Sequence, residues 1–258
     1  MDAELEAELE ALTSYFDGSD AEVSHRTMPG DQVEISLQVQ LGVSFPFSVG
    51  REGGATAQVE HLPPATLRAT VSPGYPEEPP RLELSCDWLS LRELSTLLRQ
   101  LDQVMAENAG GSIVFQLACF LTSVEALVEL QLPEVLVLNP LGGIEDHTIL
   151  DLRARQECCS AAMAWTRLAA HTEQARARKF AGQLHLCGVC FEEVAGSKVV
   201  QLASCQHIFC RECLGSLCDV QISDGTLQMV RCPSLGCNQP LILPDVAQLV
   251  NRETFERF

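Results

Sequence analysis

The stretch "CQHIFCREC", residues 205–213, places three cysteines and one histidine within nine positions. Further cysteine pairs flank it on both sides, so that eight cysteines and histidines follow one another at short spacings. In chain order the series runs Cys187-x2-Cys190, Cys205-x-His207-x2-Cys210-x2-Cys213, Cys232-x4-Cys237. Thiolates and imidazoles are the ligands of structural zinc, and eight of them are enough for two closed tetrahedral sites. The spacing therefore predicts a small domain that two zinc ions stabilise.

Two other interpretations of these cysteines are weaker. The pair Cys187–Cys190 has the Cys-x-x-Cys form of a thioredoxin-like redox centre, but such centres stand alone in a βαβ setting. Unrelated buried cysteines would not repeat ligand spacings in this order. Cys218 falls outside the series, and we interpret it as a packing residue. His185 could replace a ligand because it precedes the first cysteine by two positions, although His207 has the better spacing.

The order of the eight residues resembles a RING finger, a family in which two zinc sites interleave. The resemblance implies that one ion is held by Cys187, Cys190, Cys210 and Cys213. It implies that the second ion is held by Cys205, His207, Cys232 and Cys237. With four protein ligands each, the ions have no position for an activated water, so we expect no hydrolytic zinc chemistry. We also expect no catalytic residue in this domain.

A RING finger typically holds a ubiquitin-charged conjugating enzyme on a shallow apolar groove. The positions that match this groove are Val189, between the first two ligands, and Pro233, beside the seventh. Leu235 is a further candidate for the same contact. These residues could instead shape the zinc loops, and the two roles are compatible. Asn238 follows the eighth ligand, where many RING fingers that stimulate transfer directly carry a basic residue.

The first 130 residues alternate between patterns that are typical of helices and of strands. Residues 3–16 carry apolar side chains at helical spacing, and residues 33–49 carry them at every second position. Because Gly42 and Pro46 interrupt this alternation, we expect two antiparallel strands. Two more strands and then two helices are predicted, over residues 67–71, 82–86, 90–109 and 112–130. The fold class is therefore α+β, with helices packed on an antiparallel sheet.

The segment "SPGYPEEPP", residues 72–80, separates the last two predicted strands. Its prolines cannot donate ladder hydrogen bonds, so we expect a rigid turn. With the order of strands and helices, this segment resembles the RWD domain over residues 1–131, a docking module that shares its fold with ubiquitin-conjugating enzymes. The sequence lacks the His-Pro-Asn motif that an active conjugating enzyme needs. Cys86 and Cys119 lie among apolar residues, so we interpret them as packing residues.

Three further segments complete the predicted order: a linker and helix over 132–183, the RING finger over 184–245, and the start of a helix over 246–258. This order resembles the ring finger protein 14 subfamily of RING-between-RING ubiquitin ligases. In that family the first RING recruits the charged enzyme, and a cysteine of a later domain accepts ubiquitin as a thioester. Because the sequence stops at Phe258, we expect a truncated chain without this cysteine. The alternative is a non-catalytic adaptor that binds a conjugating enzyme or a ligase partner.

Charge divides the sequence into two unequal parts. Residues 1–150 contain 24 acidic and 6 basic side chains, a net charge of −18, whereas residues 151–258 contain 11 of each. Neither part has the stripe of basic residues that a nucleic-acid-binding surface needs, so we expect no nucleic acid partner. The expected partners are proteins: a conjugating enzyme, ubiquitin and an unknown protein on the RWD-like domain. The sequence shows no membrane-spanning run and no signal peptide. We therefore expect a cytoplasmic or nuclear protein that binds no membrane and keeps its thiols reduced.

Overall fold

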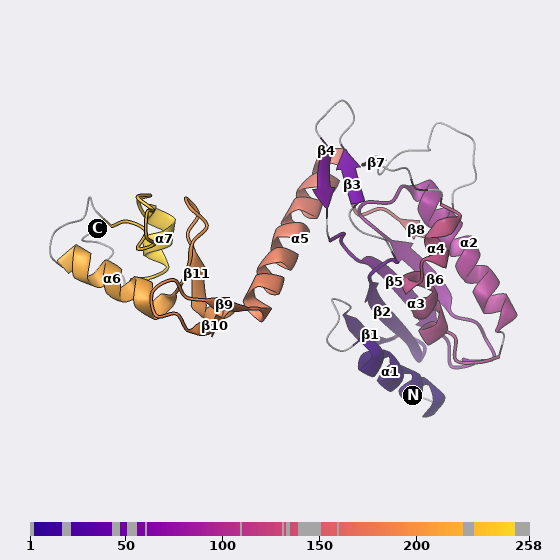
Figure 1. Cartoon of the computed structure of the whole chain (residues 1–258). Helices are drawn as coiled ribbons and strands as arrows, with labels where there is room; N and C mark the ends of the chain where they lie inside the picture. The colour runs from indigo at the N-terminus through magenta and orange to yellow at the C-terminus, as the bar shows by residue number, and fades with distance from the viewer. Residues whose placement is uncertain are drawn as a thin grey trace. The chain divides into compact units, whose positions relative to one another are not determined.

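A computed structural model describes residues 3–16, 22–42, 47–50, 56–59, 61–108, 110–130, 132, 135–138, 151–158, 160–223 and 230–250. The chain forms two compact units: unit 1, residues 1–173, and unit 2, residues 174–258 (Figure 1). Each unit has its own hydrophobic core. The predicted α+β class is confirmed, because unit 1 combines helices with a largely antiparallel sheet.

In the described part of the chain, unit 1 is built on a five-stranded sheet with the order β1-β2-β5-β6-β8. The strands are β1 (Val23–Met28), β2 (Gln32–Val39), β5 (Ala65–Val71), β6 (Arg81–Ser85) and β8 (Ala154–Arg155). Neighbouring strands run antiparallel, except that β8 runs parallel to β6. Every second residue of β2 and β5 is buried. The sheet therefore has an apolar inner face and a polar outer face.

Helices α1 to α4 contribute apolar side chains to the core on the inner face. Their bounds are α1 (Ala3–Phe16), α2 (Leu91–Glu107), α3 (Val114–Thr122) and α4 (Glu125–Val128). Helix α2 begins with the capping box that "SLREL" indicates, because the backbone N–H of Glu93 donates to Ser90 Oγ and the Glu93 carboxylate accepts from Ser90 N–H. The single helix predicted over residues 112–130 is wrong, since Ser123 is extended and separates α3 from α4.

The predicted alternation over residues 33–49 is interrupted as expected, but β2 pairs with β1 and β5 rather than with the strand that follows it. That strand, β3 (Phe47–Gly50), joins a separate sheet with β4 (Thr56–Val59) and β7 (Val135–Val137). Gly42 lies where the chain leaves the larger sheet. Its backbone passes so close to the end of α3 that a Cβ atom would lie 2.5 Å from the carbonyl carbon of Ser123. Pro46 and residues 139–150 of the predicted linker lie outside the described residues.

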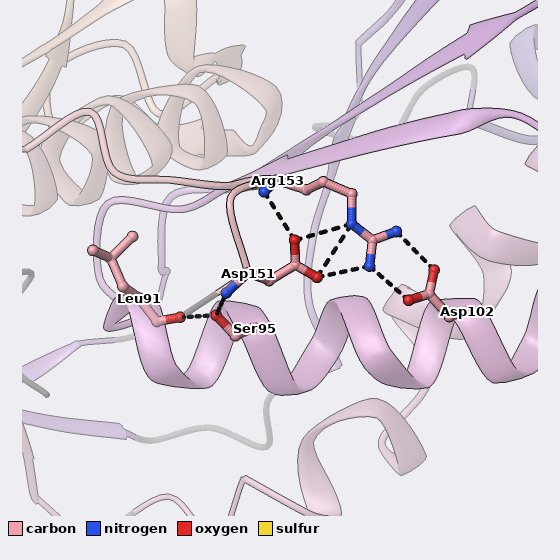
Figure 2. A network of polar contacts seen from close by, with 5 residues as sticks. All are labelled: Leu91, Ser95, Asp102, Asp151 and Arg153. Carbon is pink, nitrogen blue, oxygen red and sulfur yellow. Dashed lines mark hydrogen bonds and ion pairs between the residues drawn. The ribbon is translucent and has the colours of Figure 1, made fainter. Parts of the chain in front are cut away.

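The linker and helix predicted over residues 132–183 contain a short strand before α5 (Ala161–Gly182). Residues 151–155 form a turn and the short strand β8, and the helix begins later. Figure 2 shows the reason. The Arg153 guanidinium donates to the Asp102 carboxylate of α2 at 2.6 and 2.7 Å, and to the carboxylate of Asp151. A bidentate pair of this kind fixes both distance and orientation, so β8 is held beside α2.

A second contact in Figure 2 continues this attachment. Ser95 Oγ of α2 accepts a hydrogen bond from the Asp151 backbone N–H at 3.1 Å and donates to the Leu91 carbonyl at 2.7 Å. Cys158 precedes α5 and is buried, with its Sγ atom 3.2 Å from Asp87 Oδ1. Its neighbour Cys159 lies outside the described residues. None of the helices in the described ranges has the length and apolar character to cross a membrane.

Unit 2 consists of short elements around a small core. They are β9 (Leu184–Leu186), β10 (Glu193–Ala195), the 3-10 helix η1 (Gly196–Lys198), β11 (Val199–Gln201), β12 (Ile208–Cys210), α6 (Arg211–Ser223) and α7 (Leu243–Ala247). Strand β9 pairs with β10 and β11 with β12, both antiparallel. The end of α5 also packs here, because a Cβ atom at Gly196 would overlap the Phe180 carbonyl oxygen. Residues 251–258, predicted as part of a helix, lie outside the described residues.

Candidate metal centres

Four cysteines from different elements of unit 2 converge on one point. Cys187 follows β9, and Cys190 lies in the turn between β9 and β10. Cys210 ends β12, and Cys213 lies in the first turn of α6. Their Sγ atoms all lie within 4.8 Å of one another. We call these four residues the first ligand group.

Backbone N–H groups surround the sulfur of Cys187. The N–H of Cys210 lies 3.2 Å from this Sγ atom, and the N–H of Val189 lies 3.5 Å from it. Burial raises the pKa of the Cys187 thiol, but hydrogen bonds from the backbone of Cys210, Cys190 and Val189 and with the Cys190 side chain outweigh burial and lower the pKa to about 6. The turn requires Gly188, because a Cβ atom there would lie 2.9 Å from the Phe209 ring. The local backbone thus favours the thiolate, which is the form that binds metal.

The second ligand group joins two separate loops. Cys205 and His207 lie between β11 and β12, whereas Cys232 and Cys237 lie between α6 and α7. Their ligand atoms also lie within 4.8 Å of one another, and Cys232 Sγ is 3.4 Å from His207 Nδ1. Gln206, between the first two ligands, has a φ of 62°. This left-handed backbone turns the chain sharply, so that both side chains point to one place.

Strand β12 connects the two groups. His207 directly precedes the strand and belongs to the second group, whereas Cys210 ends it and belongs to the first. In the hairpin, Phe209 of β12 lies opposite Val200 of β11, and both side chains are buried. The structure brings the eight predicted residues together in the same interleaved sets that the RING resemblance implied. Their role as zinc ligands stays a prediction.

The chemistry of both groups fits zinc. In a tetrahedral site with Zn–S distances of ~2.3 Å, the sulfur atoms lie ~3.8 Å apart. Ligand atoms that already lie within 4.8 Å of one another need only small side-chain movements to reach that geometry. Four thiolates, or three thiolates and one imidazole, are typical ligand sets of structural zinc. Two ions per chain is the number that these sets predict.

The alternative residues weighed from the sequence do not join these groups. His185 Nε2 lies 2.9 Å from the Phe180 carbonyl oxygen, and the two rings are stacked. Cys218 of α6 is fully buried in the core of unit 2, and burial raises its pKa to about 11. Among the described histidines, cysteines and carboxylates, the two ligand groups are the clusters with metal-binding geometry.

The described thiols of unit 1 have pKa values that burial raises. Cys86 follows β6 and is buried, and its burial raises the pKa of the thiol to about 12. Burial also raises the pKa of Cys119 on α3, and it raises that of Cys158 to about 11. A thiol that stays protonated at neutral pH is a poor nucleophile. These surroundings suit the packing role that the sequence predicted for Cys86 and Cys119.

Exposed apolar side chains lie beside both ligand groups. Val189 is 42% exposed, Pro233 is partly exposed, and Leu235 is fully exposed. Phe191, which was not predicted as a surface residue, directly follows Cys190 and is 73% exposed with a φ of 60°. A bulky residue with positive φ is unusual and indicates a sharply constrained turn. The signal in the sequence that could have indicated Phe191 is an aromatic residue directly after a predicted ligand.

Two family models match the chain. Residues 3–124 match the RWD domain, and residues 187–233 match the RING-type zinc-finger. The chain therefore contains an RWD domain followed by a RING-type zinc finger. These two parts correspond to the sheet-and-helix core of unit 1 and to the ligand groups of unit 2.

Curated relatives are similar across both parts. The E3 ubiquitin-protein ligase RNF14 of Danio rerio is 29% identical over 98% of this chain, and that of Homo sapiens is 27% identical over 98%. The E3 ubiquitin-protein ligase itt1 of Schizosaccharomyces pombe is 24% identical over 79%. The chain spans 58%, 60% and 43% of the lengths of these three relatives, respectively. The resemblance to the ring finger protein 14 subfamily thus extends over nearly the whole chain.

Proposed function

We propose that this chain is the enzyme-recruiting and partner-docking part of a RING-between-RING ubiquitin ligase. Unit 2 binds a ubiquitin-charged conjugating enzyme, and the RWD domain docks a substrate or another partner protein. The observation that carries the proposal is the pair of interleaved ligand groups, flanked by exposed Val189 and Leu235. The names of the relatives support the same reaction class. A cytoplasmic or nuclear location, which we also propose, suits reduced thiols.

Zinc would have a structural role in this mechanism. Bound zinc would cross-link four segments of unit 2 and so hold the loops of Val189 and Pro233 at a fixed separation. The exposed apolar side chains would then be buried against the conjugating enzyme, which lowers the free energy of the complex. Because zinc would already hold these loops in place, less conformational entropy would be lost when the complex forms.

Acyl transfer in this proposal uses cysteines from other molecules or domains. Ubiquitin arrives as a thioester on the conjugating enzyme and passes to a second nucleophile by attack on the thioester carbonyl. The described cysteines of this chain either belong to the ligand groups or have pKa values raised by burial. We propose that the acceptor cysteine belongs to a part of the ligase outside this chain.

Replacing Val189 with Arg tests the enzyme-binding surface. The charge would have to be desolvated at an apolar contact, so we expect binding to a ubiquitin-charged conjugating enzyme to weaken by at least about 30-fold. Val220→Arg is the matched control, because Val220 is an exposed valine of α6 in the same unit. Affinity is measured by biolayer interferometry and zinc by mass spectrometry. Unchanged affinity of Val189→Arg with intact zinc content would refute the proposed surface.

A non-catalytic adaptor is the second candidate. The observation in its favour is Asn238, which is exposed and occupies the position where transfer-stimulating RING fingers carry a basic residue. An adaptor would bind the charged enzyme without leading to transfer. Sequencing the transcript beyond the codon for Phe258 separates the candidates: further Cys/His clusters in frame favour the ligase, and a stop codon favours the adaptor.

A further inference from the structure

The outer face of the five-stranded sheet in unit 1 contains a broad hollow. Its volume is about 730 Å³, and its lining comes from β1, β2, β5, β6 and the segments before β6 and β8. Met28, Pro79 and Pro80 contribute apolar surface, while Arg68 and Arg81 contribute positive charge. Within the described residues, the lining includes no helical residue. The hollow is therefore open to a partner on the face opposite the core.

The charge of this face is opposite to that of the unit. Residues 1–173 contain 27 acidic and nine basic side chains, a net charge of −18. On the outer face, the strands carry two glutamates, Glu34 and Glu83. The same strands place four arginines there: Arg26, Arg68, Arg81 and Arg155. Nearly half of the basic residues of a strongly acidic unit thus lie on one face.

The side chains of two of these arginines have no partner among the residues that the structure describes. Glu34 is paired with Arg26 at 2.8 Å, and Glu83 is paired with Arg155 at 3.0 Å. The side chains of Arg68 and Arg81 make no hydrogen bond or ion pair with any residue that the structure describes. Arg68 lies in the middle of the sheet and is only partly exposed. Its guanidinium is thus a cation on a hollowed surface that is available to an external carboxylate.

The spacing of Arg68 and Arg81 matches that of an extended peptide. Arg68 lies opposite Glu83 in the register of β5 and β6, so Arg81 is its diagonal neighbour. Diagonal neighbours on adjacent strands lie about 7–8 Å apart, with their Cβ atoms somewhat closer. In an extended chain, side chains on the same face repeat about every 7 Å. Acidic residues at alternate positions of such a chain can therefore reach both arginines.

We propose that this hollow binds an extended acidic segment of a partner protein, with Arg68 and Arg81 pairing with its Asp or Glu side chains. The inference rests on the proposed docking role of the RWD domain and specifies the chemistry of its partner. Met28 and the two prolines offer contacts for apolar side chains that alternate with the acidic ones. At an ionic strength of ~0.15 M the Debye length is ~8 Å, so a short segment interacts with these arginines more than with distant carboxylates.

A nucleic acid fits this face less well than an acidic peptide. A long polyanion would extend from the hollow over the acidic remainder of the unit, where its phosphates would be repelled. The described lining also contains no aromatic side chain on which a base could stack. The partner is therefore a polypeptide.

The test uses the full chain and a fluorescein-labelled peptide of six Glu-Val repeats, with fluorescence anisotropy as the measurement. We expect saturable binding, and binding at least about tenfold weaker when Gln replaces each Glu. The double variant Arg68→Glu with Arg81→Glu should also bind at least about tenfold more weakly. The matched control is Arg92→Glu with Arg99→Glu, which makes the same charge change on exposed positions of α2. Its affinity should stay within about twofold of the parent chain.

The inference would be overturned by the absence of saturable binding, by equal binding of the Glu and Gln peptides, or by undiminished binding by the Arg68/Arg81 variant. Displacement of the peptide by a twelve-nucleotide single strand at lower concentration than by unlabelled peptide would overturn it too. If charge reversal unfolds unit 1, as circular dichroism would show, Arg68→Gln with Arg81→Gln replaces it. Binding of the charged conjugating enzyme by these variants is measured in parallel. That binding tests the ligase proposal separately, because it depends on unit 2.

Discussion

A buried carboxylate, Glu8, connects three segments of unit 1. The residue is 5% exposed, and its carboxylate accepts from the Tyr75 hydroxyl at 2.6 Å and from the Phe115 N–H at 2.9 Å. The Tyr75 oxygen in turn accepts from the Ile113 N–H at 2.7 Å. Helix α3 has no side-chain cap of its own, so these two residues satisfy the free N–H groups at its positive end. Burial and the bond to Glu8 raise the pKa of Tyr75, which keeps its proton.

Replacing Tyr75 with Phe tests this arrangement. The change removes the partner of the buried Ile113 N–H and leaves the Glu8 carboxylate with the Phe115 N–H alone of these two donors, so we expect the free energy of unfolding of unit 1 to fall by about 1–3 kcal/mol. Urea unfolding followed by circular dichroism measures the effect. Glu6→Gln is the control, because Glu6 is exposed on the same helix, and its effect should stay within about 0.5 kcal/mol. Equal effects of the two changes would show that the network contributes nothing.

Periodic elements of unit 1 could be predicted, whereas polar and very short ones could not. Strands β2 and β5 bury every second residue, and the leucines of α2 form a regular stripe. Strand β1 was missed because "VSHRTM" exposes most of its residues on both faces. Strand β8 has two residues, and long-range contacts to Asp102 and Ser95 position its segment. No local pattern in the sequence predicts such long-range contacts.

The candidate site could be predicted more completely than the fold, for a local reason. Metal ligands recur at short spacings, because a single turn must bring two side chains to one ion. The spacing therefore predicted the eight residues, whereas the resemblance to a RING finger implied their interleaved grouping. The exposure of a side chain cannot be predicted from spacing in this way. Phe191 has the composition of a core residue, but its position in the turn leaves it on the surface.

Arg153→Ala should release β8 from unit 1. The change removes the bidentate pair with Asp102 and leaves two neighbouring carboxylates without their cation. We expect backbone hydrogen exchange in residues 151–158 to become at least about tenfold faster, as mass spectrometry of peptides would show. Arg155→Ala is the control from the same strand, since its pair with Glu83 is largely exposed and contributes little. Similar exchange in both variants would assign the stability of β8 to its backbone pairing alone.

At the scale of the whole molecule, the two units derive their stability from different sources. Unit 1 buries a large cluster of apolar side chains from its helices and strands. Unit 2 has a smaller core, in which cysteines of both ligand groups are themselves core or neighbouring residues. Small domains with limited cores generally depend on metals or cross-links. Removal of metal should therefore affect the units unequally.

Cys210→Ser should unfold unit 2 and leave unit 1 folded. The change removes a thiolate from the first ligand group. In model peptides, the binding of structural zinc contributes about 10–16 kcal/mol to the free energy of folding. Native mass spectrometry should find two zinc ions in the parent chain and fewer zinc ions in the variant. The NMR signals of unit 1 should persist in the variant. Cys218→Ala is the control, as a buried cysteine of the same unit outside both groups. A folded unit 2 without zinc would contradict this account of its stability.

The position of β12 between the two ligand groups has a consequence for cells that are short of metal. His207 and Cys210 lie at opposite ends of one three-residue strand, so loss of either group disturbs the hairpin that supports the other. Under the proposed zinc binding, half-loaded molecules would be scarce. A declining supply would divide the population into competent and incompetent chains instead of weakening every chain equally. Scarcity would thus change how many molecules recruit an enzyme, while each loaded molecule kept its full affinity.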